Sequence, residues 1–547
     1  MNSSTVTAHS MTTTMMHMPM TVQMIMRHGL SVFPDSRVGT FDGETLHYKS
    51  YAEIGLEAAK LATALQSLGI APGDRVGTFS WNNNAHMAAY LAIPSMGAIM
   101  HTVNIRLSPE HIAYIINHAE DRVLLLDASL LSVFEPVLPL LDSLEHLIII
   151  DGDSLPAGFA ASHYHDLVDA SEPMQDWPDL DETSAAAACY TSGTTGNPKG
   201  VVYSHRTTFV HSLASRAADT FGISERDRIL LLPPMFHANA WGLPYSGWFS
   251  GSDFILPGPH LQVPAIMKMV AAARPTITAT VPTILGDLLR FDSSELDMSC
   301  FRMLVCGGSA VAPAMIDAVR EQWGVPVLQG WGMTETSPLC ALSHPPRDPG
   351  EQGETAWRAK SGRPVSGVEV RVVDDAGKAL PHDGESVGEL QLRGPWITGG
   401  YHNNDSADAI SADGWLRTGD VGHIDQKHYV QLTDRTKDVI KSGGEWISSV
   451  DLENTLLAHP DVTEVAVIAT ADERWQERPL VVMVAANDEV EASTLRNWLQ
   501  DKVARFWVPE YWCLVAEIPK TSVGKFDKKR LREMNEAGEL DVEVLGK

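Results

Sequence analysis

The feature that most constrains the fold of this chain is a glycine-rich loop of eleven residues, Tyr190-Thr-Ser-Gly-Thr-Thr-Gly-Asn-Pro-Lys-Gly200. Its three glycines carry no side chain, so backbone N–H groups can close on an anion. Ser192, Thr194 and Thr195 add hydroxyl donors, and Lys199 adds a positive charge. This composition predicts a phosphate-binding loop.

The segments on either side of the loop predict how it is held. The apolar run Ala185–Tyr190 predicts a buried strand, and Ser204–Ala217 predicts a helix. A strand, a glycine-rich turn and a helix in this order form a phosphate cradle. The loop is not a Walker A motif, because Gly200 follows the lysine and Pro198 precedes it. A flexible surface turn is the alternative for the loop taken by itself.

Length and charge exclude several classes of protein. A chain of 547 residues is too long for one hydrophobic core and predicts two or more domains. The formal net charge of −28 would repel nucleic acid from most of the surface, so we expect no nucleic-acid partner. No apolar run reaches about 18 residues, so we expect no membrane span. Peripheral contact with a membrane stays open.

Cysteine usage and the first residues indicate the compartment. Five scattered cysteines without a Cys-x-x-Cys pair argue against a zinc site and for reduced thiols in a cytoplasmic protein. The N-terminal stretch is rich in Met, Thr and Ser and lacks the basic and apolar parts of a secretion signal. We expect residues 1–19 to be a disordered lead-in.

Hydrophobic periodicity divides the rest of the chain into three parts. From about residue 45 to 330, helical and strand-like patterns alternate, which predicts parallel sheets covered by helices. After about residue 365, short segments of alternating polarity predict an antiparallel β subdomain. The last ~110 residues predict a small, separate α+β domain. The expected fold class is α/β, with a large N-terminal domain of α/β sheets plus a β subdomain, and a small mobile C-terminal domain.

We place the large domain at residues 20–433 and the small domain at 439–547. The charged run Asp434-Arg-Thr-Lys-Asp438 lies between them. We expect it to be a hinge, with ordinary solvated surface as the alternative.

Two glycine motifs follow predicted strands. Leu304-Val-Cys-Gly-Gly-Ser-Ala310 ends a buried strand on two glycines, where a flat ligand can lie against the backbone. In Gln329-Gly-Trp-Gly-Met-Thr-Glu335, the indole offers an aromatic face and the glutamate a hard carboxylate suited to Mg²⁺. The structural alternatives are a tight strand–helix turn and a core tryptophan beside a surface glutamate.

Two segments carry candidate polar groups in the large domain. Pro233–Trp241 is apolar and aromatic and would line a pocket, where we expect His237 to act by position rather than as an acid or base. Trp415-Leu-Arg-Thr-Gly-Asp420 ends in a carboxylate that can accept both hydroxyls of a ribose. An Asx turn before the next strand is the alternative for the second segment.

Two further segments lie towards the C-terminus. Lys437-Asp-Val-Ile-Lys-Ser-Gly-Gly-Glu-Trp-Ile447 contains two glycines that allow close approach of a thin ligand. Pro519-Lys-Thr-Ser-Val-Gly-Lys525 is a loop with a lysine after a glycine. Judged alone, the second segment is an ordinary exposed loop.

The order of these motifs resembles that of the adenylate-forming superfamily, which includes acyl-CoA synthetases, adenylation domains of peptide synthetases and firefly luciferase. The resemblance spans Thr45 to Arg532. Within it, Pro234–Gly242, Lys441–Asn454 and Trp475–Pro479 are similar to bacterial medium- and long-chain fatty acyl-CoA synthetases. Methylthio-propionate CoA ligases share much of this pattern.

The resemblance implies ATP, Mg²⁺ and CoA (as a substrate), and it implies roles for individual residues. The catalytic residues would be Lys525, Glu335, Thr334 and His237. Mg²⁺ would be placed by Ser192 and Glu335. The residues that bind ATP or AMP would be Thr191, Ser192, Gly193, Thr194, Thr195, Gly196, Lys199, Gly308, Gln329, Gly330, Trp331, Thr334, Asp420 and Arg435.

The resemblance also implies moving parts. Lys437 would be the hinge, and Trp241 would gate an acyl tunnel. The loop on the CoA side would contain Lys441, Gly443, Gly444 and Trp446.

The implied activity is an ATP-dependent fatty acid–CoA ligase that forms acyl-AMP and then acyl-CoA, with a domain rotation between the two steps. One alternative is a CoA ligase for a short or functionalised acid such as methylthio-propionate. Others are a fatty acyl-AMP ligase that feeds a carrier protein, and a binding paralogue without catalysis. The sequence leaves acyl length and oligomeric state open, although relatives of this kind are often homodimers.

Overall fold

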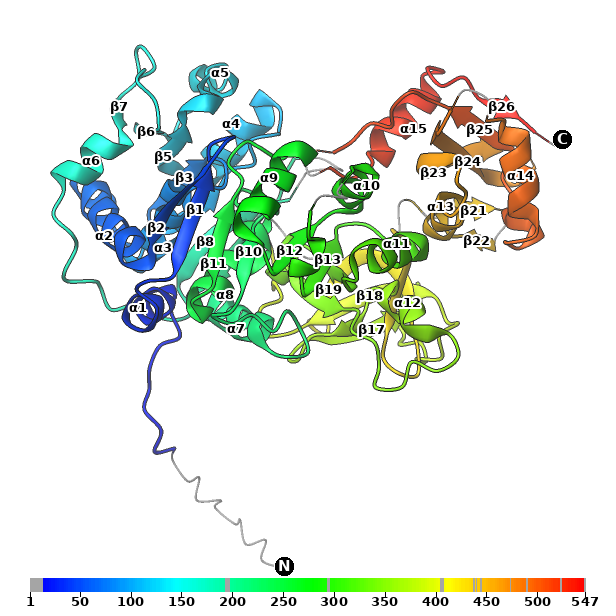
Figure 1. Cartoon of the computed structure of the whole chain (residues 1–547), viewed down its shortest axis with the longest axis horizontal. Coiled ribbons are helices and arrows are strands. Elements are labelled where there is room, and N and C mark those ends of the chain that lie inside the picture. The colour runs from blue at the N-terminus through cyan, green and yellow to red at the C-terminus, as the bar shows by residue number, and fades with distance from the viewer. Residues whose placement is uncertain are drawn as a thin grey trace, which may run out of the picture.

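Four β-sheets with helices around them organise the chain (Figure 1). The computed structural model describes residues 13–191, 197–292, 296–403, 408–435, 438, 440–442, 445–472, 474–487, 490–521 and 524–545, without the side chains of residues 445 and 446. The fold is α/β, as the sequence predicts. A large body holds three of the sheets, and the fourth belongs to residues from 440 onward.

The first sheet has seven strands, of which neighbours pair in parallel except for the last two. Its order is β7 (Ala161–His163), β6 (His146–Ile150), β5 (Asp121–Asp127), β3 (Arg75–Phe79), β4 (Ile99–Thr102), β8 (Ala185–Tyr190) and β9 (Gly200–Ser204). The helices that connect these strands are α3 (Asn84–Ser95), α4 (Pro109–Ala119), α5 (Leu131–Phe134) and α6 (Tyr164–Ala170), and α2 (Tyr51–Ser67) leads into β3. A capping box between Ser50 and Glu53 starts α2.

The second sheet has nine strands, with a parallel centre and antiparallel edges. Its order is β16 (Arg363–Pro364), β15 (Leu339–Leu342), β14 (Val327–Gly332), β13 (Met303–Gly307), β12 (Ile277–Thr280), β10 (Arg228–Leu230), β11 (Asp253–Leu256), β1 (Arg37–Phe41) and β2 (Leu46–Ser50). Its helices include α1 (Val22–Val32), α7 (His205–Arg216), α8 (Leu243–Ser250), α9 (Val263–Ala273), α10 (Pro282–Arg290), α11 (Pro313–Trp323) and α12 (Gly353–Arg358).

The phosphate loop is held differently from the prediction. The strand Ala185–Tyr190 and the helix are present, but the loop does not lead into the helix. Residues Gly200–Ser204 first form β9, which pairs antiparallel with β8 and places Gly200 opposite Tyr190. In β9, Val201 and Tyr203 are buried and Val202 is exposed, which is the alternation of a strand with one solvated face. The loop therefore closes a β-hairpin, and the expectation of a strand–turn–helix cradle is wrong.

The third sheet confirms the predicted antiparallel subdomain. Its strands are β17 (Glu369–Val373), β18 (Gly388–Arg393), β19 (Leu416–Ile424) and β20 (Val430–Arg435), in that order. Asp434 and Arg435, the first two residues of the proposed hinge, complete β20.

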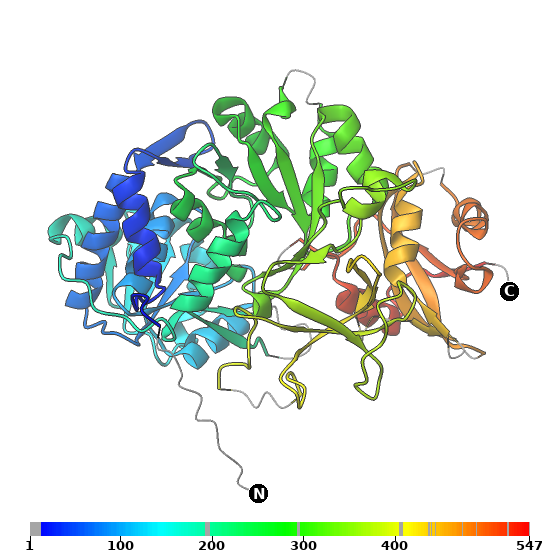
Figure 2. The ribbon, with the colours of Figure 1, turned by 90° about the horizontal axis from the view of Figure 1, so that it is seen from below.

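The fourth sheet forms the core of the C-terminal part. A long antiparallel pair, β23 (Val462–Asp472) and β24 (Gln476–Ala485), is joined by β25 (Tyr511–Leu514), β26 (Glu543–Val544), β21 (Ile440–Ser442) and β22 (Glu445–Ile447). The helices α13 (Ser449–Leu457), α14 (Ala492–Gln500) and α15 (Lys528–Glu536) accompany this sheet. Its apolar residues form clusters separate from those of the large body. Figure 2 shows this part beside the body, with α13 at the boundary.

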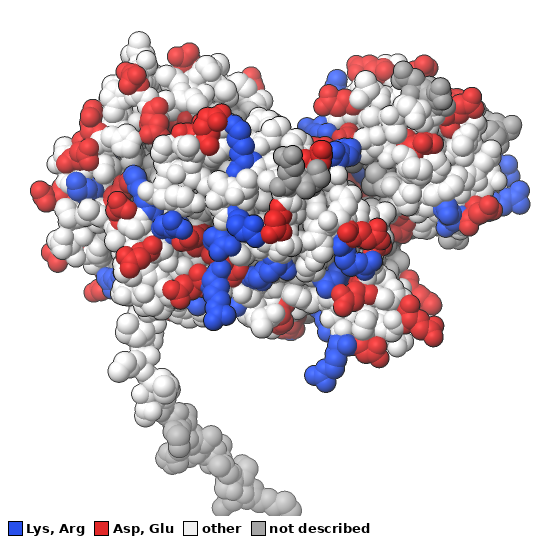
Figure 3. All heavy atoms as spheres, in the orientation of Figure 1, with Lys and Arg blue, Asp and Glu red and all other residues white. Residues whose placement is uncertain are grey.

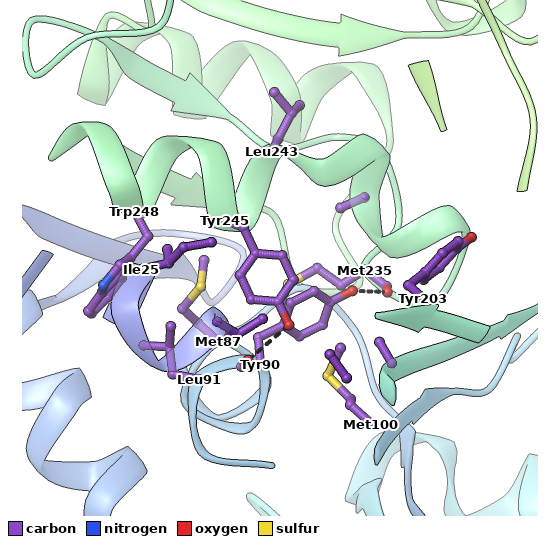
Figure 4. Close-up of a cluster of buried hydrophobic side chains, with 14 of the residues drawn as sticks. Ile25, Met87, Tyr90, Leu91, Met100, Tyr203, Met235, Leu243, Tyr245 and Trp248 are labelled. Atoms are coloured by element: carbon purple, nitrogen blue, oxygen red, sulfur yellow. Dashed lines mark hydrogen bonds between the residues drawn. The ribbon is translucent and has the colours of Figure 1, made fainter. Parts of the chain in front are cut away.

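The helices α1, α3 and α8 share one apolar core with residues of the first two sheets. All residues of α3 are buried, which explains why its sequence is apolar on every side. In Figure 4, the Tyr90 hydroxyl donates to the carbonyl of Met235, and Tyr245 donates to the carbonyl of Tyr90 at 3.0 Å. These bonds fix the start of the segment that carries His237 and Trp241.

Candidate active site

A cavity of about 840 Å³ opens at the carboxyl ends of the parallel strands β12–β14 and extends to the C-terminal part. This edge of a parallel sheet is where α/β proteins bind ligands. In Figure 3 a hollow separates the body from the smaller lobe, and charges of both signs are mixed on the visible face. The predicted site residues that line the cavity are Thr191, Lys199, His237, Trp241, Gly308, Gln329, Gly330, Trp331, Thr334, Glu335, Asp420, Arg435 and Lys525.

The end of β13 requires glycine for close approach. Gly308 has φ +87°, and a Cβ atom added there would lie 2.9 Å from Cε of Lys525. A side chain at this position would therefore strain the backbone and displace the lysine. The absence of a side chain at Gly308 allows the small domain to bring its amine against the strand end.

The end of β14 is rigidly bonded. Gln329 is buried, and its Oε1 accepts a bond of 2.8 Å from the backbone N–H of Val311. The carbonyl of Thr334 accepts a bond of 2.7 Å from the Tyr203 hydroxyl. Gln329 thus supports the turn after β13, so the structure gives its side chain a scaffolding contact in addition to the predicted place beside the nucleotide.

Glu335 and Lys199 meet at a residue that the sequence motifs did not single out. The Tyr401 hydroxyl donates to Oε1 of Glu335 at 2.6 Å, and the Lys199 ammonium lies 4.9 Å from the centre of the Tyr401 ring. The ammonium over the ring is a cation–π arrangement. Burial raises the pKa of Tyr401, and so does the neighbouring Glu335, so the hydroxyl stays a donor. The only signal in the sequence was a tyrosine after Gly399 and Gly400.

Asp420 lies inside strand β19 and is 4% exposed, so the alternative of an Asx turn is excluded. Its Oδ2 accepts a bond of 2.8 Å from the indole N–H of Trp331, and its Oδ1 lies 3.1 Å from Nε of Arg435. The nearby Asp420 carboxylate raises the pKa of Arg435, so the guanidinium keeps its charge. The carboxylate faces the cavity between an aromatic ring and a cation.

Lys525 reaches the cavity from the loop before α15. Gly524 has φ +81°, and its carbonyl accepts a bond of 3.2 Å from the Thr283 hydroxyl of the large body. Burial of the amine, and secondarily repulsion from Arg435, lowers the pKa of Lys525 to about 8, against the attraction of Asp420. The amine is therefore charged at neutral pH but close to its titration.

His237 and Trp241 lie in a segment of unusual backbone. Residues 238–241 have φ between +44° and +59°, a left-handed turn that costs free energy for residues other than glycine. The Trp241 ring packs on Gly307, since a Cβ added to Gly307 would lie 3.1 Å from it. Burial, with Lys525 and Arg106 nearby, lowers the pKa of His237 to about 3. The imidazole is therefore neutral at ordinary pH, which fits a positional role.

Some predicted site residues are not brought to the cavity or cannot be placed. Lys441 is exposed and does not line the cavity, and its backbone N–H donates to Glu477. Outside the described residues lie Ser192, Gly193, Thr194, Thr195, Gly196, Lys437, Gly443 and Gly444, together with the side chain of Trp446. Their assignments stay predictions.

Two absences concern the described part of the chain only. It contains no group of three or more His, Cys, Asp or Glu side chains placed to hold a metal ion by themselves. Within those residues, every helix is too short or too polar to cross a membrane.

Comparisons with known proteins agree with this geometry. Residues 26–402 match the family described as AMP-binding enzyme, and residues 451–525 match the AMP-binding enzyme C-terminal domain. The chain is 44% identical over 498 residues to the long-chain-fatty-acid–CoA ligase of Thermus thermophilus, covering 89% of this chain and 90% of that protein. It is 40% identical over 530 residues to the 3-methylmercaptopropionyl-CoA ligase of Ruegeria pomeroyi, and the match covers 95% of this chain and 98% of that protein.

The fold also has a close counterpart among solved structures. The crystal structure of the anthranilate CoA ligase AuaEII in complex with anthranoyl-AMP aligns with a TM-score of 0.86 and 26% identity, covering 96% of this chain and 99% of that one.

Proposed function

This chain belongs to the AMP-binding enzyme family, and we propose that it is an ATP-dependent fatty acid–CoA ligase. The observation that carries the proposal is the meeting of four charged groups in one cavity. Lys199, Glu335 and Asp420 come from the large body, and Lys525 comes from the small domain. Each can serve one part of an acyl-adenylation reaction.

In the first half-reaction, the carboxylate of the fatty acid attacks the α-phosphorus of ATP and pyrophosphate leaves. The product is acyl-AMP, whose AMP portion is a good leaving group. The protein contributes mainly position and compensation of charge. Asp420 binds the ribose, Lys199 faces the departing pyrophosphate, and the Lys525 ammonium stabilises charge that develops around the α-phosphate.

Glu335 fits the predicted magnesium site. Its carboxylate lines the cavity and is 6% exposed, and the Tyr401 hydroxyl holds one of its oxygens. Because Mg²⁺ usually takes one or two carboxylates and completes its shell with phosphates and water, the lack of a larger acidic cluster among the described residues suits a metal that arrives with ATP. Bound there, Mg²⁺ would neutralise phosphate charge. Ser192 remains the second proposed ligand.

In the second half-reaction, the CoA thiol attacks the carbonyl carbon of acyl-AMP and AMP leaves. Lys525 and its loop occupy one side of the cavity and would obstruct the thiol. A rotation of residues 439–547 about Lys437 would withdraw Lys525 and bring the loop with Lys441, Gly443, Gly444 and Trp446 towards the site. In the arrangement that forms acyl-AMP, the proposed rotation requires the CoA-side loop to lie away from the cavity. The exposed position of Lys441 outside the cavity agrees with that requirement.

A second candidate substrate is 3-methylmercaptopropionate. The relative from Ruegeria pomeroyi carries that name and matches almost the whole chain. The test is a series of acids from propionate to palmitate with 3-methylmercaptopropionate included, scored by CoA-dependent AMP formation. A maximum at the longer acids supports the proposal, and a preference for the sulfur acid replaces it.

The same series separates the remaining alternatives. Pyrophosphate release that needs no CoA and yields no thioester with CoA indicates a ligase that feeds a carrier protein. No pyrophosphate release with any acid indicates a binding paralogue.

The proposal extends to the setting of the enzyme. All five cysteines are free, as expected of a cytoplasmic enzyme. A homodimer and peripheral contact with a membrane remain part of the proposal. Light scattering of the purified protein and flotation with lipid vesicles would test them.

A further inference from the structure

Trp331 and Asp420 form a buried pair at the back of the cavity. Trp331 is the last residue but one of β14 in the nine-stranded sheet, and Asp420 lies in β19 of the four-stranded sheet. The indole N–H donates to Oδ2 of Asp420 at 2.8 Å, and the two residues are 5% and 4% exposed. This bond joins two sheets where a nucleotide is proposed to bind.

The carboxylate of Asp420 is restrained at both oxygens. Oδ1 lies 3.1 Å from Nε of Arg435, while Oδ2 takes the indole bond. The backbone N–H of Asp420 donates to the Thr418 hydroxyl at 3.0 Å, which anchors the main chain as well. Two partners on opposite oxygens define the plane of a carboxylate, whereas a single partner leaves it free to turn.

The remaining capacity of Asp420 matches a vicinal diol. An ionised carboxylate offers about four acceptor positions, so a bond to each oxygen from Trp331 and Arg435 leaves one position on each oxygen. A ribose presents two neighbouring hydroxyl donors. Both can be accepted together only if the plane of the carboxylate is set in advance.

We propose that Trp331 is a positioning residue for ribose recognition: its indole N–H holds Asp420 in the orientation that reads both hydroxyls. This inference rests on the nucleotide site of the proposed function. It assigns the indole N–H a task that is separate from any contact between the indole face and the adenine. The N–H governs discrimination against deoxynucleotides, and the face governs affinity for all adenine nucleotides alike.

The test compares Trp331→Phe with the unsubstituted protein, because phenylalanine keeps an aromatic face and lacks the N–H. Dissociation constants are measured by calorimetry for AMP, 2′-deoxyAMP and 3′-deoxyAMP. The unsubstituted protein should bind AMP about tenfold more tightly than either deoxynucleotide, since each lacks one hydrogen bond to a charged group. In Trp331→Phe this ratio should fall to about twofold or less.

Trp357→Phe is the matched control. In the unsubstituted protein, the indole N–H of Trp357 donates to the carbonyl of Pro349 at 2.8 Å, and Trp357 does not line the cavity. It should keep the full ratio. If Trp331→Phe does not fold, Trp331→Leu takes its place, because it removes the same N–H without adding another donor. Its loss of the aromatic face should weaken binding of all three nucleotides alike, so the ratio remains the readout. Asp420→Asn should lower the ratio by itself. Adding Trp331→Phe to Asp420→Asn should lower the ratio no further, because both substitutions act through the same carboxylate.

The outcomes separate this inference from the function on which it rests. Trp331→Phe that binds all three nucleotides more weakly by one common factor, or that keeps the full ratio, overturns the inference and leaves the proposed function standing. An unsubstituted protein that binds no AMP overturns both.

Discussion

The two walls of the cavity are built in different ways. On the large body, the ends of β13 and β14 and the middle of β19 are fixed by sheet pairing and by buried bonds such as the one from Trp331 to Asp420. On the small domain, Lys525 lies in a loop whose bond to the large body comes from the Thr283 hydroxyl to the carbonyl of Gly524. The difference indicates that the wall formed by the large body keeps its shape, while the wall formed by the small domain can move away from the cavity.

Bonds near the joining segment support the same contrast. Ser448 donates to the carbonyl of Thr433, and the backbone N–H of Ser449 donates to Oδ2 of Asp434. Both bonds lie where the chain passes from one part to the other, so a rotation about this point would disturb little of either core.

The largest expected effect comes from removing the amine of the movable wall. Lys525→Ala should lower acyl-AMP formation by about 10²–10³-fold, the usual effect of losing one group that stabilises developing charge. Thioester formation from supplied acyl-AMP and CoA should change little, because the amine is withdrawn in that step. Single-turnover measurements of each half-reaction check the contrast. Equal losses in both would mean that the small domain does not divide its work in this way.

The next effect is the pH dependence of the same amine. Since the pKa of Lys525 is lowered to about 8, the ammonium is present below that pH and disappears above it. The rate of pyrophosphate exchange into ATP should therefore decrease above pH 8, and the decrease should approach about tenfold per pH unit. His237, with a pKa of about 3, should add no change between neutral pH and that limb.

Lys525→Arg sharpens this test. A guanidinium stays charged through the whole range, so the variant should lose the alkaline limb even where its overall rate is lower. A limb that persists unchanged in Lys525→Arg would assign the titration to another group.

A smaller effect is expected on the fixed wall. Tyr401→Phe removes the bond of 2.6 Å to Glu335 but keeps the ring beneath Lys199. We expect about a tenfold loss in acyl-AMP formation, the size of one hydrogen bond to a charged group, and a higher Mg²⁺ requirement for ATP binding in calorimetry. Tyr401→Leu removes the ring too and should weaken ATP binding further. Variants that behave identically would exclude a separate role for the ring.

The sequence predicted most of the residues that meet in this cavity because they occur in ordered motifs, while the roles assigned to them stay predictions. Thirteen predicted positions, from Thr191 to Lys525, line one cavity. What it missed depends on contacts between distant segments. Tyr401 is 66 residues from Glu335, and Trp331 is 89 residues from Asp420. No local pattern encodes either bond, since each arises only when separate strands and loops are brought together.

The error at the phosphate loop has a different origin. The segment Gly200-Val-Val-Tyr-Ser204 contains two β-branched residues and a tyrosine, which favour a strand. The segment was too short to compete with the helical pattern that follows it, and strand pairing with β8 decided the outcome. The local sequence therefore predicted the strand before the loop, but not that a second strand, β9, follows it.

The smallest expected effect concerns the bond between the small domain and the segment that joins the two walls. Arg532 of α15 pairs with Asp438 at 2.5 Å, and both side chains are largely shielded, at 25% and 12% exposed. Arg532→Gln should loosen the small domain in the present arrangement and lower acyl-AMP formation by a few fold, as expected for an ion pair worth about 1 kcal/mol. Arg530→Gln is the control, because Arg530 lies on the same helix at 51% exposure and pairs only with surface glutamates among the described residues. Single-turnover rates that fall equally in both variants would trace the effect to helix α15 itself, whereas a loss confined to Arg532→Gln would identify the pair with Asp438 as a bond that fixes the small domain to the joining segment.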